Sequence, residues 1–189
     1  MSRAYRIKVR ESLDRTIRAQ DTVSTRLEIL QLLPVEQMAG LLAVELEKAG
    51  YERKGDALKR EKDGVVISVN PSTGDVTVRA KSCEEVSLEA ERDGRAYDEE
   101  GPSGKGVREE LRRQVQSVLE KEANKKQAAL QSEVTDRLES QLIDLSRELD
   151  GVVNRATAEA LKIKAAQLGQ IKEMSEDKET GSLTIVLEV

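Results

Sequence analysis

The chain of 189 residues contains no histidine and only one cysteine, Cys83. The absence of histidine removes the commonest general base and metal ligand, so any chemistry would depend on carboxylates, lysine, tyrosine and one thiol. A single cysteine can form no disulfide within the chain and no thiolate zinc cluster. We therefore expect a non-enzymatic protein of a reducing compartment, without catalytic residues, cofactor or metal.

Aromatic residues are also scarce, because tryptophan and phenylalanine are absent and only three tyrosines are present. Apolar residues make up 38% of the chain and charged residues 35%. The apolar residues are mostly leucine, valine, alanine and isoleucine, which suit narrow helix seams and small sheets. Deep ligand cavities are usually lined by aromatic and apolar side chains, so the composition argues against one.

Long hydrophobic runs are missing as well. No window approaches the roughly 18 apolar residues of a transmembrane helix, and residues 1–12 lack the apolar run of a secretory signal. The formal net charge is −5, which argues against a nucleic-acid binder that depends on neutralising phosphates. The sequence therefore predicts a cytoplasmic protein with no membrane segment.

What the sequence does contain is a helical pattern over residues 105–168, without proline and with only Gly106 and Gly151 as interruptions. In its second half the apolar residues follow steps of three and four, and two sets repeat at seven, which is typical of a coiled-coil seam. The predicted interaction seam comprises Val134, Leu138, Leu142, Leu145, Leu149, Val152 and Ala156. We expect this seam to pack on a second helix, in the same chain or in another copy.

The N-terminal part predicts a small α+β head. Residues 4–10 alternate between apolar and basic side chains, as in a half-buried strand. Residues 11–33 are undecided, with Asp21 or Ser24 as the cap of a short helix. Pro34 is suited to the start of a helix over 34–49, which ends at Gly50.

After Gly50 the apolar period changes to two, which predicts an antiparallel meander that needs a helix over one face. Its strands would cover residues 58–60, 65–69, 76–80 and 86–90, with loops at 63–64, 70–74 and 81–85.

The tail resembles one of these loops. Residues 177–185 match 70–78 in side-chain type at most positions, and both segments look like hairpin loops. We predict a C-terminal hairpin that pairs 170–174 with 183–189, returns to the sheet and is entered at Gly169. Convergence on good hairpin chemistry explains the echo better than a duplicated domain does.

The full prediction is an α+β fold: a small antiparallel sheet with one or two helices, a long antiparallel helical coiled-coil arm and the hairpin. The predicted boundaries are 1–92 for the head, 93–104 for a linker, 105–168 for the arm and 169–189 for the hairpin. If the hairpin returns to the head, the arm must reverse near 124–127 or near 150–151. The sequence leaves this choice open.

Candidate chemical motifs have simpler explanations. Residues 101–106, GPSGKG, lack the spacing of a phosphate-binding loop and suit a linker with Ser103 as a helix cap. Cys83 is flanked by two glutamates, which disfavour a thiolate nucleophile. Acidic pairs at 84–85, 99–100 and 109–110 lack the spacing of a calcium loop and suit solvated faces. The basic cluster of Arg108, Arg112 and Arg113 suits i,i+4 pairing on a helix.

Four segments of the chain together resemble small bacterial proteins encoded beside AAA+ ATPases. The segments are 147–154, which begins RELD, 158–166, which reads AEALKIKAA, 169–189 and 24–38. The resemblance is to accessory components of bacterial ternary conflict systems built around an ATPase of the FtsH type. It implies a non-catalytic partner of an ATPase and carries over no functional residues.

The favoured hypothesis is thus an adaptor that binds a protein partner, an AAA+ ATPase or protease of such a defence system, with homo-oligomers formed through the arm. The alternatives are a coiled-coil structural or nucleic-acid-associated protein without an ATPase partner, and a carboxylate-based enzyme. An enzyme would need several titrating groups that converge in one pocket, and a nucleic-acid binder would need a continuous basic face.

Overall fold

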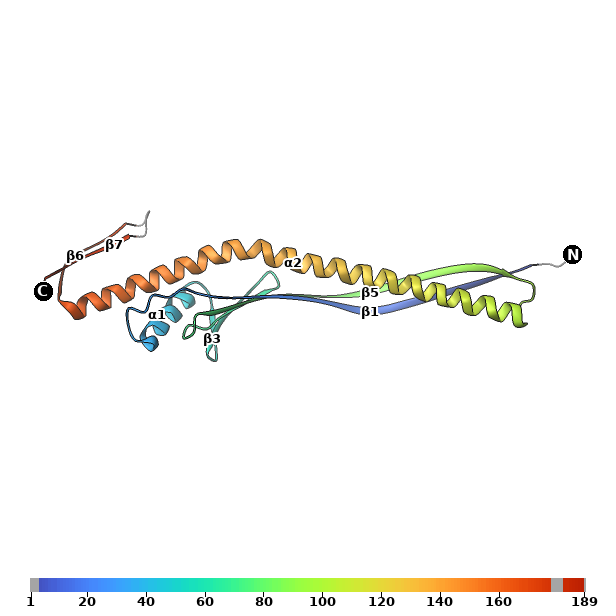
Figure 1. Ribbon diagram of the computed structural model, residues 1–189, viewed down its shortest axis with the longest axis horizontal. Coiled ribbons are helices and arrows are strands. Elements are labelled where there is room, and N and C mark those ends of the chain that lie inside the picture. The colour runs from blue at the N-terminus through green and yellow to red at the C-terminus, as the bar shows by residue number, and fades with distance from the viewer. Residues whose placement is uncertain (1–3, 178–181, 189) are drawn as a thin grey trace. The chain divides into compact units, whose positions relative to one another are not determined.

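The computed structural model describes residues 4–177 and 182–188 and has the predicted α+β fold (Figure 1). The elements follow in the order β1 (Tyr5–Arg26), α1 (Val35–Lys48), β2 (Glu52–Lys54), β3 (Ala57–Lys62), β4 (Val65–Val69), β5 (Asp75–Ala96), α2 (Pro102–Leu168), β6 (Gln170–Asp177) and β7 (Ser182–Glu188).

Five strands form one sheet in the order β1-β5-β4-β3-β2. The predicted meander is confirmed for β3, β4 and the first residues of β5, which pair antiparallel from Leu58↔Val69 to Val69↔Val76. The long strand β1 lies at one edge and the three-residue β2 at the other. β1 runs antiparallel to β5, because Arg6 pairs with Asp93 and Lys8 with Glu91.

β1 is much longer than the strand predicted over 4–10, and the short helix considered for 11–33 is wrong. From Ile7 to Val23 the odd-numbered residues are buried or half-buried, with the exception of Arg15. The apolar residues continue at a spacing of two through polar neighbours, which is the periodicity of a strand with one face covered. That period decides against the helix.

β5 is likewise continuous, so the predicted loop at 81–85 is wrong. The even-numbered residues face the buried side at Val76, Val78 and Ala80, and again at Val86 and Leu88. An interval of six residues keeps this face in register across the polar segment, so the strand continues through it.

The predicted helix over 34–49 and the loop over 70–74 are confirmed. Pro34 immediately precedes α1, and Gly50 follows it with a positive φ of 89°. In the loop, the Asn70 side chain accepts hydrogen bonds from the N–H groups of Ser72 and Thr73, and Gly74 has φ 76°. Local turn chemistry therefore determines both segments.

α2 is a single helix, so the predicted reversal near 124–127 or 150–151 is wrong. Its apolar stripe passes through both places, at Ala123 and at Val152, and both side chains are buried. Gly151 interrupts neither the helix nor the stripe. Because the stripe is covered at both places, the helix has no need to fold back on itself there.

The chain divides into two compact units, and each contains parts of both the predicted head and the predicted arm. Unit 1 comprises residues 1–20 and 81–135, and unit 2 comprises residues 21–80 and 136–189.

In unit 1, α2 packs on β1 and β5. The stripe formed by Leu111, Val115 and Leu119 is buried, as are Ile17 and Leu88 on the strands. A Cβ added to the strand glycine at 94 would lie 3.2 Å from a methyl group at 107 on the helix, which shows how closely the two elements approach. The paired strands β1 and β5, a two-stranded ribbon, therefore bury the apolar stripe of α2.

Polar contacts fix the helix on β1 in the same unit. Arg112 pairs with Glu11 at 2.9 Å, whereas the sequence predicted i,i+4 pairing for this arginine. The side-chain amide of Gln127 donates to the carbonyl oxygen of Arg18 at 2.6 Å. The opposite face of the ribbon is charged, with basic residues of β1 opposite acidic residues of β5, and includes the Arg10–Glu89 pair.

Unit 2 contains the meander, α1, the C-terminal part of α2 and the hairpin. A small core cluster joins Leu33 and Met38 to Ala160 of α2. On the sheet, Val65 and Val69 of β4 and Val76 of β5 are also buried. The covering helix that the sequence assigned to this sheet is therefore accompanied by a second, α2.

The C-terminal hairpin is confirmed, with α2 ending at Leu168 and β6 pairing with β7. Among the described residues it forms a separate two-stranded sheet, whereas the sequence had placed it with the head. Part of the predicted loop, residues 178–181, lies outside the described residues. No helix in the described part of the chain is long and apolar enough to cross a membrane.

Candidate functional site

The predicted seam is largely buried within the chain itself. Val134, Leu138, Leu145, Leu149, Val152 and Ala156 are buried, and Leu142 is half-buried. The next residue, Ile143, is 62% exposed on the other side of the helix. The seven positions therefore form one face of α2, as their spacing predicts.

The neighbours of this face in unit 2 come from the sheet and from α1. Leu142, Leu145 and Leu149 lie beside Val76 and Val78 of β5. One turn beyond Ala156, Ala160 packs in the cluster of Leu33 and Met38. Since the strands and α1 cover most of the apolar face, a second copy of the chain is not needed to bury the seam. Its role as an interaction seam stays a prediction.

The apolar face of α2 is not completely packed: within unit 2, a groove of about 780 Å³ lies between α2 and the strands. Apolar residues supply most of its walls, and polar or charged side chains, such as Arg26 and Asp150, also line it. The apolar walls comprise Val23, Leu27, Val76, Val78, Leu142, Leu145, Leu149 and Val153. We call this site the seam groove.

An ion pair fixes α2 beside the seam groove. Arg60 of β3 donates two parallel hydrogen bonds to the Glu148 carboxylate, at 2.7 and 2.8 Å, and a third to the carbonyl oxygen of Ala49 at 3.0 Å. The guanidinium lies 4.5 Å from the centre of the Tyr51 ring. The hydrogen bond to Glu148 raises the pKa of Arg60, and burial together with the Glu148 charge raises the pKa of Tyr51.

A second charged cluster joins α1 to α2. The buried Glu45 accepts from Lys48 at 2.6 Å and from Arg155 at 2.9 Å. Burial acts to raise the pKa of Glu45, but the two cations outweigh it, so the pKa lies below its usual value. Both clusters satisfy their charges within the chain and position the helix, which makes them structural elements of the site.

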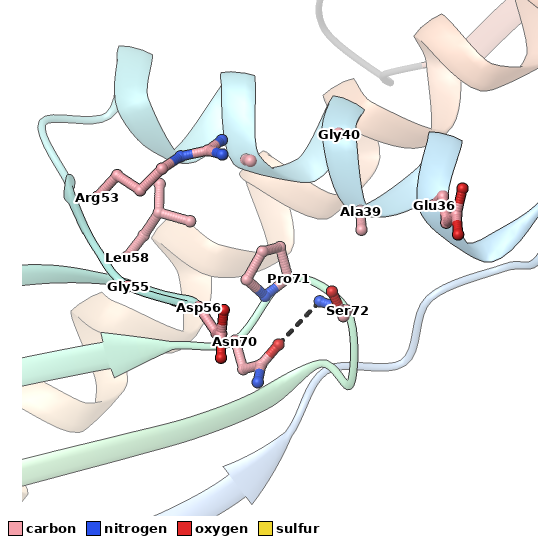
Figure 2. Close-up of a pocket in the computed structure, with 11 residues that line it drawn as sticks. Glu36, Ala39, Gly40, Arg53, Gly55, Asp56, Leu58, Asn70, Pro71 and Ser72 are labelled. Atoms are coloured by element: carbon pink, nitrogen blue, oxygen red, sulfur yellow. Dashed lines mark hydrogen bonds between the residues drawn. The ribbon is translucent and has the colours of Figure 1, made fainter.

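A second groove, of about 540 Å³, lies between α1 and two connections of the sheet (Figure 2). The helix contributes Ala39 and Gly40, and the opposite wall is formed by Asp56 and the Asn70–Ser72 segment. The Ser72 N–H donates to the Asn70 side chain at 2.9 Å, which shapes that wall. Sequence reasoning missed this groove, although small residues at 39, 40 and 43 were a signal of an open helix face.

The glycine-rich residues 101–106 form the capped start of α2. The Asp98 carboxylate accepts the N–H of Gly104 at 2.9 Å, and the Gly101 carbonyl oxygen accepts the N–H of Lys105 at 3.0 Å. The cap is therefore Asp98 rather than Ser103. A phosphate would need the amide that this carboxylate already engages, so the arrangement does not resemble a phosphate-binding loop.

The other candidate chemical residues singled out from the sequence lie apart from one another. Cys83 is exposed on β5, and the acidic pairs at 84–85, 99–100 and 109–110 lie on exposed positions. Within the described residues, no three acidic, histidine or cysteine side chains converge as metal ligands would. Of the basic cluster, Arg112 pairs with Glu11 of β1.

The fold is that of an α+β protein built from an antiparallel meander, one long helix and a terminal hairpin. The model of one protein family, FtsH ternary system domain X5, matches residues 1–189, and the chain belongs to this family. Comparisons with curated proteins and with solved structures give no match. The resemblance stated from the sequence is thereby confirmed.

Proposed function

We propose that the chain is a non-catalytic accessory protein of an FtsH-type ternary conflict system, and that it binds an AAA+ ATPase or protease of that system as an adaptor. Family membership supports the association with such a system. The observation that supports binding is the seam groove, where Leu142 of the predicted seam is only half-buried by the chain itself. The proposed setting is the cytoplasm.

The chemistry of the seam groove suits a short apolar segment of a protein. Its volume of about 780 Å³ lies within the range of roughly 300–1,000 Å³ that is usual for binding sites. Aliphatic walls with polar and charged residues among them are the arrangement that receives one face of an amphipathic helix. A partner helix with two or three aliphatic anchors at i, i+3 and i+4 matches these features.

A non-catalytic role fits the positions of the groups whose pKa is shifted. Arg10, Glu45, Tyr51 and Arg60 are each held by a specific ion pair or by burial, and none of them lines the seam groove. The charged residues that do line it are few. A binding surface without converging titratable groups is the simplest interpretation.

The test is binding between this chain and the purified ATPase encoded in the same system, measured by calorimetry or biolayer interferometry. Leu142→Glu places a charge in the seam groove and should weaken binding at least about tenfold. Ile143→Glu is the matched control, because the neighbouring apolar side chain is exposed outside the groove. It should bind within about twofold of the unmodified chain.

Circular dichroism must first show that both variants keep the helix content and melting temperature of the unmodified chain. Equal binding by folded Leu142→Glu would exclude the seam groove as the binding site. Failure of the unmodified chain to bind the ATPase would reject the adaptor role itself.

A further inference from the structure

The C-terminal hairpin has one apolar face, which depends on an irregularity in β6. Met174 pairs with Ile185, and Ile171 pairs with position 187. Positions 185 and 187 are two residues apart and share a face, whereas Ile171 and Met174 are three apart. The register shift between Ile171 and Glu173 corrects this difference, so Ile171 and Met174 lie on one face with Ile185.

The described part of the chain covers this apolar face only in part. Ile171, Leu183 and Ile185 are only half-buried, and Met174 is 44% exposed. A two-stranded hairpin without a covering layer or a third strand is at best marginally stable in water. The hairpin therefore has a physical reason to acquire further strands.

The two edges of the hairpin differ in their suitability for another strand. β6 contains the register shift and the adjacent charges Lys172 and Glu173, which are features that protect an edge from pairing. β7 pairs without a shift from Ser182 to Val186, and its only charged residue is Glu188, at its end. The open edge of β7 is thus the regular one, and its single charge lies at the end of the strand.

We propose that β7 pairs antiparallel with β7 of a second copy, so that two hairpins form one four-stranded sheet. A two-fold axis at Ile185, the centre of the seven-residue strand, pairs the whole of β7 with its copy. This register places Glu188 opposite Ser182, so no like charges meet. It also keeps Leu183 and Ile185 of both copies on one apolar face.

The end of α2, which precedes this hairpin in the chain, also carries exposed apolar side chains. Leu161 and Leu168 are seven residues apart and so lie on one side of the helix, and they are 37% and 61% exposed. Leu168 is separated from β6 only by position 169. The dimer would therefore combine a wider sheet with aliphatic side chains that the single chain leaves exposed.

The first test uses a symmetric disulfide in the full chain, with Cys83→Ser as background. Ile185→Cys would lie directly opposite its own copy, at a Cα separation of about 4.5–5.5 Å, which suits a disulfide. Mild oxidation should give a covalent dimer that reductant separates. Met174→Cys is the matched control, because β7 and its copy would separate the two positions by about 14 Å.

The second test measures mass against concentration by light scattering after size exclusion. The unmodified chain should form a dimer, and Ile185→Lys should weaken it on the order of tenfold or more, because two lysines would meet at the axis. Met174→Lys adds the same charge to the same face but away from the open edge, and should affect the dimer less.

Three results would overturn the proposal. They are a monomer at all concentrations, equal cross-linking from positions 174 and 185, and equal loss of the dimer in both lysine variants. The last would indicate association through the apolar face rather than through the edge. ATPase binding at the seam groove is a separate measurement, so its failure or success leaves these results unaffected.

Discussion

Substitution of the Arg60–Glu148 pair is the most direct test of how α2 is held on unit 2. The pair is bidentate, and its side chains are 22% and 34% exposed, so solvent screens it only partly. Glu148→Gln keeps the size of the side chain but removes the charge. Arg60 would then remain over Tyr51 without its counter-ion.

The expected loss in the free energy of unfolding lies between two known limits for ion pairs. Breaking a buried pair by removing one partner costs about 3–5 kcal/mol, whereas an exposed pair contributes about 0.2–1 kcal/mol. Partial exposure places Glu148→Gln between these limits, at about 2 kcal/mol. For a chain of this size, that loss corresponds to a fall in melting temperature of roughly 4–8 °C.

A double-mutant cycle with Arg60→Met and Glu148→Gln, measured by urea denaturation, isolates the interaction between the two residues. We expect a coupling free energy of about 1–2 kcal/mol. The Arg6–Asp93 pair of unit 1 is the control, because its atoms lie at a similar distance of 3.0 Å but its side chains are 72% and 52% exposed. Equal coupling in the two cycles would refute the argument that burial makes the difference.

Two further predictions concern a turn and a titration. Gly74→Ala should destabilise the protein by about 1–2 kcal/mol, because φ is 76° and the new Cβ would lie 3.1 Å from a backbone oxygen. Gly106→Ala is the control: it lies inside α2 with open space around it and should stabilise the protein by up to about 1 kcal/mol. The urea midpoints of the two variants and of the unmodified chain measure both effects. Glu45, whose pKa the salt bridges to Lys48 and Arg155 hold below the usual 4.5, stabilises the fold above that pH and loses the effect as pH falls through its lowered pKa. The difference in melting temperature between the unmodified chain and Glu45→Gln should therefore be largest near neutral pH and shrink in acid, and a difference that grows in acid would contradict this sign.

The segments that the sequence predicted correctly are those determined by local chemistry. α1 begins after a proline and ends before a glycine, and the β4–β5 loop is shaped by the Asn70 side chain and by the positive φ of Gly74. The helical character of residues 105–168 was predicted because proline is absent and because the apolar positions of the second half follow steps of three and four. Such signals act within a few residues, so no tertiary information was needed.

The strand lengths could not be read in the same way. Residues 11–20 and 81–85 contain so many polar side chains that they resemble loops. In the structure one face of this ribbon is solvated and charged, as in the Lys8–Glu91 pair, so polar residues are expected at alternate positions. The remaining signal was the spacing of buried residues across the polar segments, and it depends on a partner strand far away in sequence.

The seam residues show which part of the packing the sequence could not predict. A helix that packs on a sheet and a helix that packs on another helix both bury residues at steps of three and four, so the pattern predicts a covered face but not what covers it. Here Val76 and Val78 of β5 lie where a second helix was expected, and the seam groove lies between them and Leu142. Because a sheet gives a broad surface and the helix stripe is narrow, the two surfaces leave a groove along their margin. The proposed partner segment would bind at this margin, since six of the seven seam residues are already buried inside the chain.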